Sequence, residues 1–372
     1  MLLGIDVSTY FEEKEAGAKY YHHGKEIDPL QAFRDNGVSL MRIRVWNNPY
    51  SLDGRPYLAG NADKDNFIKL ANLAKEYGYH FILDFHYSDF WADPGRQLAP
   101  KSWNGLSFEE VRVKVYEFTK SVLEEAKTNE IPIDFVQVGN EITNGMIWPY
   151  GMIDGDTWPR GNYENLSKLL KAGCDAVREI YENAKIIIHL EKSYDHEIYK
   201  EYLSNIINFG VDFDVLGVSY YPCWHGTFDQ LFSNITKCRE LFHKDIMIME
   251  LGYGFTLDDY AYDGSKGRLV FSQLTVEGLF KELPEPFTKE GQAKFVKDFL
   301  TLARKNNVLG VCYWEPLWIP GKNICWASEA ALEYIHEEGK DTRNNWANQC
   351  LFDYEGQATP AFDEFIEKED NL

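Results

Sequence analysis

Near the middle of the chain lies the segment Val136-Gln137-Val138-Gly139-Asn140-Glu141-Ile142-Thr143-Asn144-Gly145-Met146-Ile147-Trp148-Pro149-Tyr150-Gly151. It begins as an apolar strand and continues as a polar and aromatic loop. In α/β folds the catalytic groups gather where strands end. Glu141, which comes just after the strand, is therefore the first catalytic candidate. An isolated Gly-Asn-Glu more often caps a helix or pairs with a surface lysine, so the role needs support from the rest of the chain.

The length and the aromatic content bound the fold and the ligand. A chain of 372 residues suits one large domain, because α/β barrels reach this size around one core. We expect residues 1–372 to form a single domain. Aromatic residues make up 15% of the chain, with 10 Trp and 23 Tyr. Such rings stack on the apolar faces of ligands as readily as they fill cores.

The net charge narrows the choice of partner. At −21, the chain would be repelled by nucleic acid and by an anionic membrane surface, so we expect neither as a partner. A neutral or cationic ligand is compatible with the charge, which can equally serve solubility alone. No apolar run is long enough to cross a membrane.

The N-terminus and the cysteines bear on location. Residues 1–5 lead straight to Asp6 without the basic region and long apolar core of a signal peptide. We therefore expect a cytoplasmic protein, or a secreted one if a leader has been removed. The six cysteines show no metal-binding spacing, which favours free thiols, with a Cys325–Cys350 disulfide as the alternative.

Apolar segments with strand character alternate with segments of helical periodicity. The predicted strands are 2–6, 40–45, 81–85, 135–138, 186–189, 215–219, 246–250 and 310–314. The predicted helices are 29–36, 65–77, 108–127, 163–181, 197–208, 228–242 and 290–306. This alternation predicts a (β/α)8 TIM barrel, with a doubly wound sheet as the alternative. Long connections follow the strands and short turns precede them, so we expect the binding groups at the C-terminal face.

Two carboxylates end predicted strands on opposite sides of the barrel mouth. Glu141 ends the fourth strand and Glu250 the seventh. Glycoside hydrolysis requires such a pair, with a separation of roughly 5 to 5.5 Å for retention and roughly 6.5 to 9.5 Å for inversion. Our hypothesis is that Glu250 is the ionised nucleophile and that Glu141 donates a proton and then acts as base. We expect Arg44 to hold Glu250 ionised and to contribute to substrate binding.

Other strand ends supply candidates for sugar binding. Asn140 is placed to hydrogen-bond a sugar hydroxyl, and Asp89 is a further polar candidate. His86 and Tyr220 could orient the sugar or the carboxylates, or simply satisfy backbone carbonyls. Arg42 has the character of a buried structural ion-pair member. The candidate stacking platforms are Trp46, Trp91, Trp224, Trp314 and Trp318, some of which would instead be barrel packing.

Metal and cofactor chemistry has little support. Residues 257–265 offer oxygen ligands for calcium but lack the ordered carboxylate spacing of a loop site, so we predict a solvated loop and no cofactor. The chain has no dinucleotide-binding, P-loop, zinc-protease or nucleophile-elbow motif, which excludes those classes.

Taken together, these motifs resemble glycoside hydrolase family 53, the arabinogalactan endo-β-1,4-galactanases. The likeness covers almost the whole chain. It runs through residues 4–8, 42–49, 86–94 with Gln97, 137–151, 219–226, 250–253, 313–318 and 351–353 with Pro360-Ala361. The resemblance implies a retaining barrel, β-1,4-galactan such as pectin side chains as substrate, Glu141 as acid/base and Glu250 as nucleophile. It also implies that the cleaved-bond sugar is lined by Asn140, His86, Tyr220 and Trp314.

The chain departs from the family pattern at several positions. Leu251 stands where Thr is common, Gly254 where Pro is frequent, and Cys223 where an aromatic residue is usual. Residues 258–267 do not reproduce the calcium loop of many family members, so we predict no calcium. These differences bear on the subsites and on the preferred chain length.

We therefore expect a monomeric, retaining endo-β-1,4-galactanase that acts on galactan or on imported galacto-oligosaccharides. A retaining β-glycanase acting on another β-1,4-glycan, such as mannan or glucan, is the nearest alternative, because fold and carboxylate pair do not fix the sugar. A non-catalytic galactan-binding barrel is the alternative from a different class.

Overall fold

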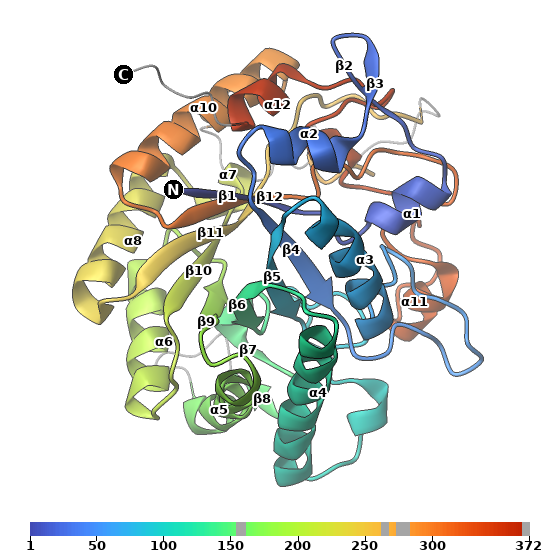
Figure 1. The fold of residues 1–372 in the computed structure, drawn as a ribbon. Coiled ribbons are helices and arrows are strands. Elements are labelled where there is room, and N and C mark those ends of the chain that lie inside the picture. Colours follow the sequence, from blue (N-terminus) through green and yellow to red (C-terminus); the bar gives the residue numbers. More distant parts are fainter. Residues whose placement is uncertain (154–160, 262–267, 273–282, 367–372) are drawn as a thin grey trace.

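Eight parallel strands close into a barrel in the order β1-β12-β11-β10-β9-β6-β5-β4 (Figure 1). The computed structural model describes residues 1–153, 161–261, 268–272 and 283–366. The barrel strands are β1 (Leu2–Asp6), β4 (Leu40–Val45), β5 (His80–Phe85), β6 (Ile133–Val138), β9 (Lys185–Leu190), β10 (Val215–Tyr220), β11 (Asp245–Leu251) and β12 (Gly310–Trp314). The predicted (β/α)8 barrel is thus confirmed, and the doubly wound alternative is wrong because β1 pairs with both β4 and β12.

All seven predicted helices are present, and they surround the barrel (Figure 1). They are α2 (Pro29–Asp35), α3 (Lys64–Glu76), α4 (Phe108–Thr128), α5 (Tyr163–Ile180), α6 (His196–Asn208), α8 (Phe228–Phe242) and α10 (Lys289–Lys305). Capping residues set several starts. Ser107 and Glu110 form a capping box before α4, and Thr227 and Gln230 form one before α8.

The structure adds short elements that the sequence did not predict. The helices are α1 (Tyr10–Glu15), α7 (Pro222–His225), α11 (Glu329–Tyr334) and α12 (Pro360–Phe365), with the 3-10 turns η1 (Lys101–Trp103), η2 (Ile142–Asn144) and η3 (Ala347–Gln349). Two hairpins pair β2 (Tyr20–His22) with β3 (Lys25–Ile27) and β7 (Gly145–Met146) with β8 (Gly151–Met152). None of these elements is long enough to show a period.

The barrel interior is layered. An apolar cluster takes its side chains from the strands alone, among them Leu40, Ile82, Phe135, Ile187, Met247 and Cys312. Side chains two residues further along a strand point to the same side. The next inward layer is therefore polar: Arg42, Asp84, Gln137 and His189 follow Leu40, Ile82, Phe135 and Ile187. The apolar layer fills one end of the barrel, and the polar layer lies under the mouth.

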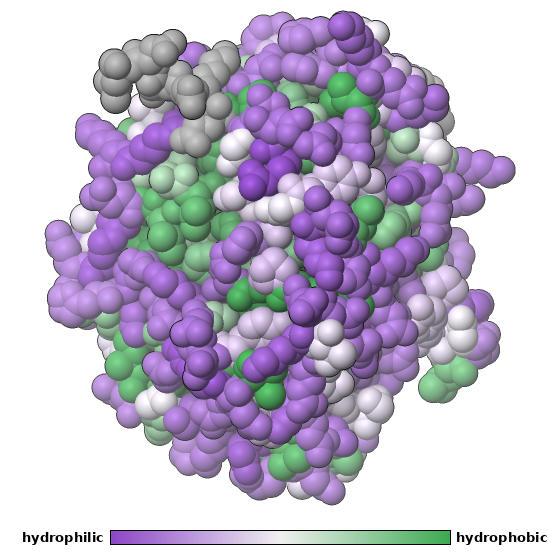
Figure 2. Space-filling model, viewed as in Figure 1, coloured by the Kyte–Doolittle hydropathy of each residue, from purple (hydrophilic) through white to green (hydrophobic). Residues whose placement is uncertain are grey.

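The face shown in Figure 2 is largely hydrophilic, and the cysteines are free thiols. Figure 2 shows that hydrophilic side chains cover most of the face in view. None of the helices in the described ranges is long and apolar enough to span a membrane. All six cysteines are buried and unpaired, so the structure contains no Cys325–Cys350 disulfide.

Candidate active site

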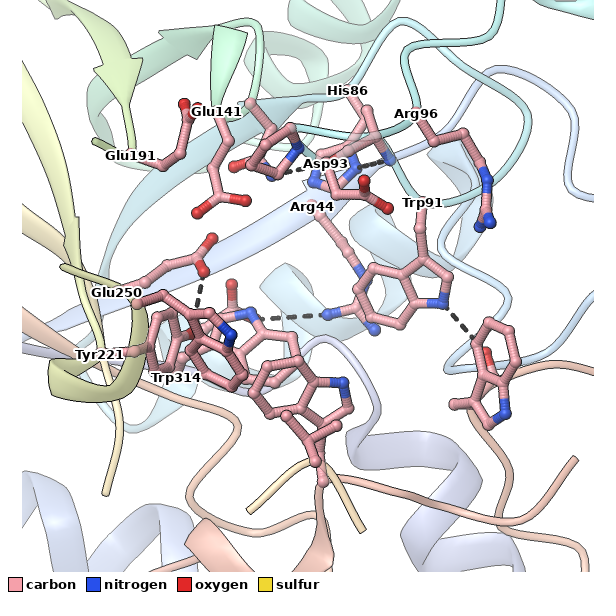
Figure 3. A pocket seen from close by; sticks show the side chains of 18 of the residues that line it. Arg44, His86, Trp91, Asp93, Arg96, Glu141, Glu191, Tyr221, Glu250 and Trp314 are labelled. Carbon is pink, nitrogen blue, oxygen red and sulfur yellow. Dashed lines mark hydrogen bonds and ion pairs between the residues drawn. The ribbon is translucent and has the colours of Figure 1, made fainter. Parts of the chain in front are cut away.

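A pocket of about 590 Å³ opens at the carboxyl ends of the barrel strands. Glu141 and Glu250 both line it, and Figure 3 shows their carboxyl groups facing each other. Trp91 and Trp314 form part of its wall. This is the mouth at which a (β/α)8 barrel carries its chemistry.

A sharp turn aims Glu141 into the pocket. Gly139 (φ 87°) and Glu141 (φ 49°) both have left-handed backbone conformations at the end of β6. A Cβ on Gly139 would lie 2.9 Å from Cγ2 of Ile142, so only glycine fits this position without displacement. Nε2 of Gln97 donates to the carbonyl oxygen of Asn140 at 2.8 Å and fixes the turn from the other side.

The surroundings of Glu141 favour its protonated form. Burial raises the pKa of this carboxyl well above its usual range, and the charges of Glu250, Glu191 and Asp93 raise it further. The Ser219 hydroxyl opposes this, because it donates to Oε1 at 2.6 Å. A carboxyl that retains its proton near neutral pH is suited to act as a general acid.

The surroundings of Glu250, on β11, help it to carry a negative charge. Nη1 of Arg42 lies 3.0 Å from Oε1, and the Tyr221 hydroxyl donates to Oε2 at 2.9 Å. Burial raises the pKa of Glu250, while Arg42 and Tyr221 lower it. Among the described residues, a cation contacts Glu250 and none contacts Glu141, so the two carboxyls have different environments.

The two carboxyl groups are close together. One side-chain oxygen of Glu141, one of Glu250 and one ring nitrogen of His189 all lie within 4.8 Å of one another. This spacing brings one oxygen of each carboxyl to the same small region of the pocket.

Arg42 is the centre of a buried hydrogen-bond network. Besides Glu250, it forms ion pairs with Asp6 (2.9 Å) and Asp84 (2.8 Å). The prediction that Arg42 is a buried ion-pair member is confirmed. The prediction that Arg44 holds Glu250 ionised is wrong, since Arg42 occupies that position.

Arg44 lies one layer closer to the mouth and has different partners. Its Nη1 is 2.5 Å from Oε1 of Glu315, and its Nη2 donates to the carbonyl oxygen of Ala59. The guanidinium lies 4.1 Å from the centre of a Trp91 ring. Burial raises the pKa of Glu315 to about 7, against the charge of Arg44. Arg44 still lines the pocket, and by stacking on Trp91 it fixes one wall.

Several predicted binding residues line the pocket together. They are Arg44, His86, Trp91, Asn140, Trp224 and Trp314. Nδ1 of His86 accepts from Nε1 of Trp46 and from the backbone N–H of Ala92, both at 3.2 Å. The proton of a neutral His86 therefore lies on Nε2, which donates to Asp84 at 3.1 Å.

The other four predicted binding residues lie behind the pocket wall. Trp46 and Trp318 are fully buried and pack against Trp91. Asp89 is also fully buried and accepts hydrogen bonds from the backbone N–H groups of Asn48 and Lys101, so it organises loops.

Tyr220 points away from the glutamates. Its hydroxyl donates to the carbonyl oxygen of Gly226, and its ring stacks with Phe299. Of the two roles predicted for Tyr220, the structure shows the hydrogen bond to a backbone carbonyl and not the orientation of a carboxylate. The neighbouring Tyr221 contacts Glu250 instead.

Further residues that line the pocket were not predicted, among them Asp93, Arg96, Glu191, Tyr221, Trp326 and Trp346. Glu191 comes directly after β9, so its place at a strand end could have been predicted from the sequence. Trp326 and Trp346 lie in long segments after β12, where no periodic pattern places a side chain.

Two groups of described residues bring potential metal ligands together, His22 with His23 and Asp363, and Glu141 with His189 and Glu250. In the first group, Nε2 of His22 lies 2.9 Å from Oδ1 of Asp363, so a hydrogen bond already joins two of the three residues. The second group is hydrogen-bonded internally through Ser219. Part of the segment considered for calcium, residues 262–267, lies outside the described residues.

Two facing glutamates among aromatic side chains at the mouth of a barrel form the kind of active site that glycosidases use. Comparison with known proteins agrees. The family model "Glycosyl hydrolase family 53" matches residues 2–365. The chain is 34% identical to an endo-beta-1,4-galactanase of Bacillus subtilis, across 97% of this chain and 84% of that protein.

Solved structures give the same result. The GH53 catalytic domain of Ignisphaera aggregans superposes with a TM-score of 0.85 at 36% identity, covering 98% of this chain and 95% of that one. A fungal beta-1,4-galactanase superposes with a TM-score of 0.77 at 26% identity, covering 99% of each chain. The chain belongs to glycosyl hydrolase family 53, as the sequence motifs had indicated.

Proposed function

We propose that this protein is a retaining endo-β-1,4-galactanase in which Glu250 is the nucleophile and Glu141 the acid/base. The observation that carries the proposal is the spacing of at most 4.8 Å between a side-chain oxygen of Glu141 and one of Glu250. Retaining glycosidases hold the two carboxyl groups roughly 5 to 5.5 Å apart and inverting ones roughly 6.5 to 9.5 Å apart, and a close approach of one oxygen of each group favours the shorter separation.

The electrostatics support the same assignment. Arg42 and Tyr221 stabilise a negative charge on Glu250, so this carboxylate attacks the anomeric carbon. Glu141, whose pKa is raised, gives its proton to the leaving glycosidic oxygen. The ester on Glu250 then carries no charge, so the pKa of Glu141 falls and Glu141 can deprotonate the incoming water.

The substrate assignment rests on the relatives. The Bacillus subtilis relative and the fungal structure are named galactanases, and both are matched along most of their length. The aromatic wall of Trp91, Trp224 and Trp314 suits sugar rings, which present apolar faces.

The first experiment tests substrate and catalytic pair together. Wild type, Glu141→Gln and Glu250→Gln are incubated with linear β-1,4-galactan, and the sizes of the released oligosaccharides are followed over time. We expect mixed short galacto-oligosaccharides from the wild type and losses of several orders of magnitude in both variants. Equal or faster cleavage of mannan or cellulose by the wild type would contradict the galactanase assignment, and binding without any cleavage would favour a binding protein.

A second experiment tests the stereochemistry. Proton NMR spectra recorded in the first minutes of galactan hydrolysis should show the β-anomer of the new reducing end before mutarotation. An initial α-anomer would mean inversion and would remove the covalent intermediate from the mechanism.

A further inference from the structure

Ser219 and His189 contact the proposed acid/base and have no role in the mechanism above. Both are fully buried, Ser219 on β10 and His189 on β9. Oγ of Ser219 lies 2.6 Å from Oε1 of Glu141, and Nε2 of His189 lies 2.8 Å from Oγ of Ser219. The three side chains form a continuous chain of hydrogen bonds.

The donor and acceptor at each of these hydrogen bonds follow from the number of hydrogens on Ser219 and His189. A serine hydroxyl has one hydrogen to donate. If Ser219 donates it to Glu141, then Ser219 has to accept its second hydrogen bond from His189. Burial and the charge of Arg42 lower the pKa of His189 well below its usual value, so the ring is neutral and carries one hydrogen. That hydrogen is on Nε2 in this arrangement.

The other side of the His189 ring is compatible with this tautomer. Nε2 of Gln137 lies 3.1 Å from Nδ1 and is a donor there, in competition with Oδ1 of Asp84 at 2.6 Å. Oδ1 of Asn140 lies 2.9 Å from Nδ1 and would favour the opposite tautomer. The opposite tautomer would turn the Ser219 hydroxyl toward His189 and away from Glu141.

The hydrogen bond that Glu141 accepts from Ser219 decides which nitrogen of His189 carries the proton. Hydrogen bonds to a carboxylate are roughly twice as strong as those between neutral groups. Ser219 is the side chain that donates to Glu141 in the described part of the chain. Glu141 is a carboxylate once it has given its proton to the leaving group, and at that stage a buried charge without this donor costs more than an unfavourable contact between His189 and Asn140.

We propose that Ser219, held by His189, is a positioning residue that binds Oε1 of Glu141 and leaves Oε2 to give and take the catalytic proton. The proposal rests on the acid/base role of Glu141. Ser219 can donate to Oε1 both when Glu141 is a carboxylate and when Oε2 carries the proton. The chain of hydrogen bonds therefore fixes one oxygen throughout the reaction and strengthens as charge develops on the carboxyl group.

The variant Ser219→Ala tests the role through its dependence on the leaving group. Galactan needs a proton on its leaving alcohol, whereas an aryl β-1,4-galactobioside with an acidic phenol does not. We expect kcat/KM to fall about tenfold to a hundredfold on galactan, the loss of one hydrogen bond to a charged group, and to change little on 2,4-dinitrophenyl galactobioside.

The pH profile gives a second readout. Glu250, Glu191 and Asp93 face Glu141 and raise its pKa, and Ser219 is the group that lowers it. Without the hydroxyl, the pKa of Glu141 rises further, so the alkaline limb of kcat/KM should move to higher pH. A merely structural serine would not move this limb.

Matched variants separate positioning from folding. Ser167→Ala removes another buried serine hydroxyl, on α5, and should change neither readout. His189→Leu should reproduce the Ser219→Ala losses, while His189→Gln should recover most of the activity because its amide can donate to Ser219. A double variant Ser219→Ala/His189→Leu should be little worse than either alone.

The experiments distinguish a failure of the positioning role of Ser219 from a failure of the acid/base role of Glu141. If Ser219→Ala loses the same factor on both substrates, or if its alkaline limb stays in place, the positioning role is overturned. If Glu141→Gln keeps wild-type rates on galactan, the acid/base assignment itself fails.

Discussion

At the level of single residues, function in this site depends on which of two similar neighbours reaches the glutamates. Arg42 and Arg44 lie on the same side of β4, two residues apart, and only Arg42 contacts Glu250. Tyr220 and Tyr221 are adjacent, and only Tyr221 contacts Glu250. Each pair supplies a variant and its matched control.

Tyr221→Phe should slow catalysis without loosening the fold. The change removes the hydroxyl that donates to Oε2 of Glu250, so we expect kcat/KM to fall about tenfold to a hundredfold. The pKa of Glu250 should rise, and the acidic limb of kcat/KM should move to higher pH because the proposed nucleophile has to be ionised. Tyr220→Phe should leave this limb in place. A shift in both variants would contradict the assignment.

Arg42→Lys should have a larger effect on the same limb. A lysine ammonium is a compact charge and cannot bridge Asp6, Asp84 and Glu250 as the planar guanidinium does. We expect a fall in kcat/KM of about a hundredfold, an upward shift of the acidic limb, and a loss of unfolding free energy of about 3 kcal/mol. Arg44→Lys is the control, since it disturbs the pairing with Glu315 without moving that limb.

The sequence could not show whether Arg42 or Arg44, or whether Tyr220 or Tyr221, contacts Glu250. Arg42 and Arg44 share a face, so alternation cannot say which layer of the barrel lies level with Glu250. At the end of β10 the register with β11 shifts between Val218 and Ser219, which interrupts the alternation that would assign Tyr220 and Tyr221. In contrast, the position of Glu141 and Glu250 at the barrel mouth was predictable, because a carboxylate at a strand end lies there whatever the register.

At the level of elements, strands and long helices were predictable, while the elements that shape the pocket were not. Strands buried on both faces are short apolar runs. Helical periodicity and N-terminal side-chain caps occur together in α3, α4, α6, α8 and α10. The turn that contains η2 and the β7–β8 hairpin has no such signal. Its shape depends on left-handed residues packed against tertiary neighbours.

Gly139→Ala tests the importance of this turn. The new Cβ would lie 2.9 Å from Ile142, at a φ of 87°, so the turn that presents Glu141 has to move. We expect a loss of unfolding free energy of about 2 kcal/mol or more and a clear fall in kcat. Gly105→Ala is matched in φ (82°) but meets no atom within 4 Å, so it should cost about 1 kcal/mol and leave kcat unchanged. Equal kcat values in the two variants would contradict a positioning role for the turn.

At the level of the whole molecule, the barrel holds several carboxyl groups that are costly to ionise. Burial raises the pKa of Glu191 and of Glu315 to about 7, and raises that of Glu13 beyond the usual range. Such groups couple the stability of the entire fold to pH. Glu191 is the most accessible to experiment, because it lines the pocket and its Oε1 has no hydrogen-bond partner among the described residues.

Glu191→Gln should make the protein less sensitive to alkaline pH. In the unfolded chain the carboxyl titrates near 4.5, whereas in the fold it keeps its proton up to about 7. Between these values the folded state binds more protons than the unfolded state, so unfolding free energy is lost as pH rises. At about 1.4 kcal/mol for each tenfold change in proton affinity, the loss is about 3 kcal/mol by pH 8.

Urea unfolding of wild type and Glu191→Gln at pH 5 and pH 8 measures this loss. We expect the variant to gain about 3 kcal/mol over the wild type between the two pH values, because Glu315 and Glu13 titrate alike in both proteins. The same variant removes a negative charge that raises the pKa of Glu141, so the alkaline limb of its kcat/KM should move to lower pH. Parallel stability curves would show that Glu191 is ionised in the fold, and an unmoved limb would show that its charge does not reach the acid/base.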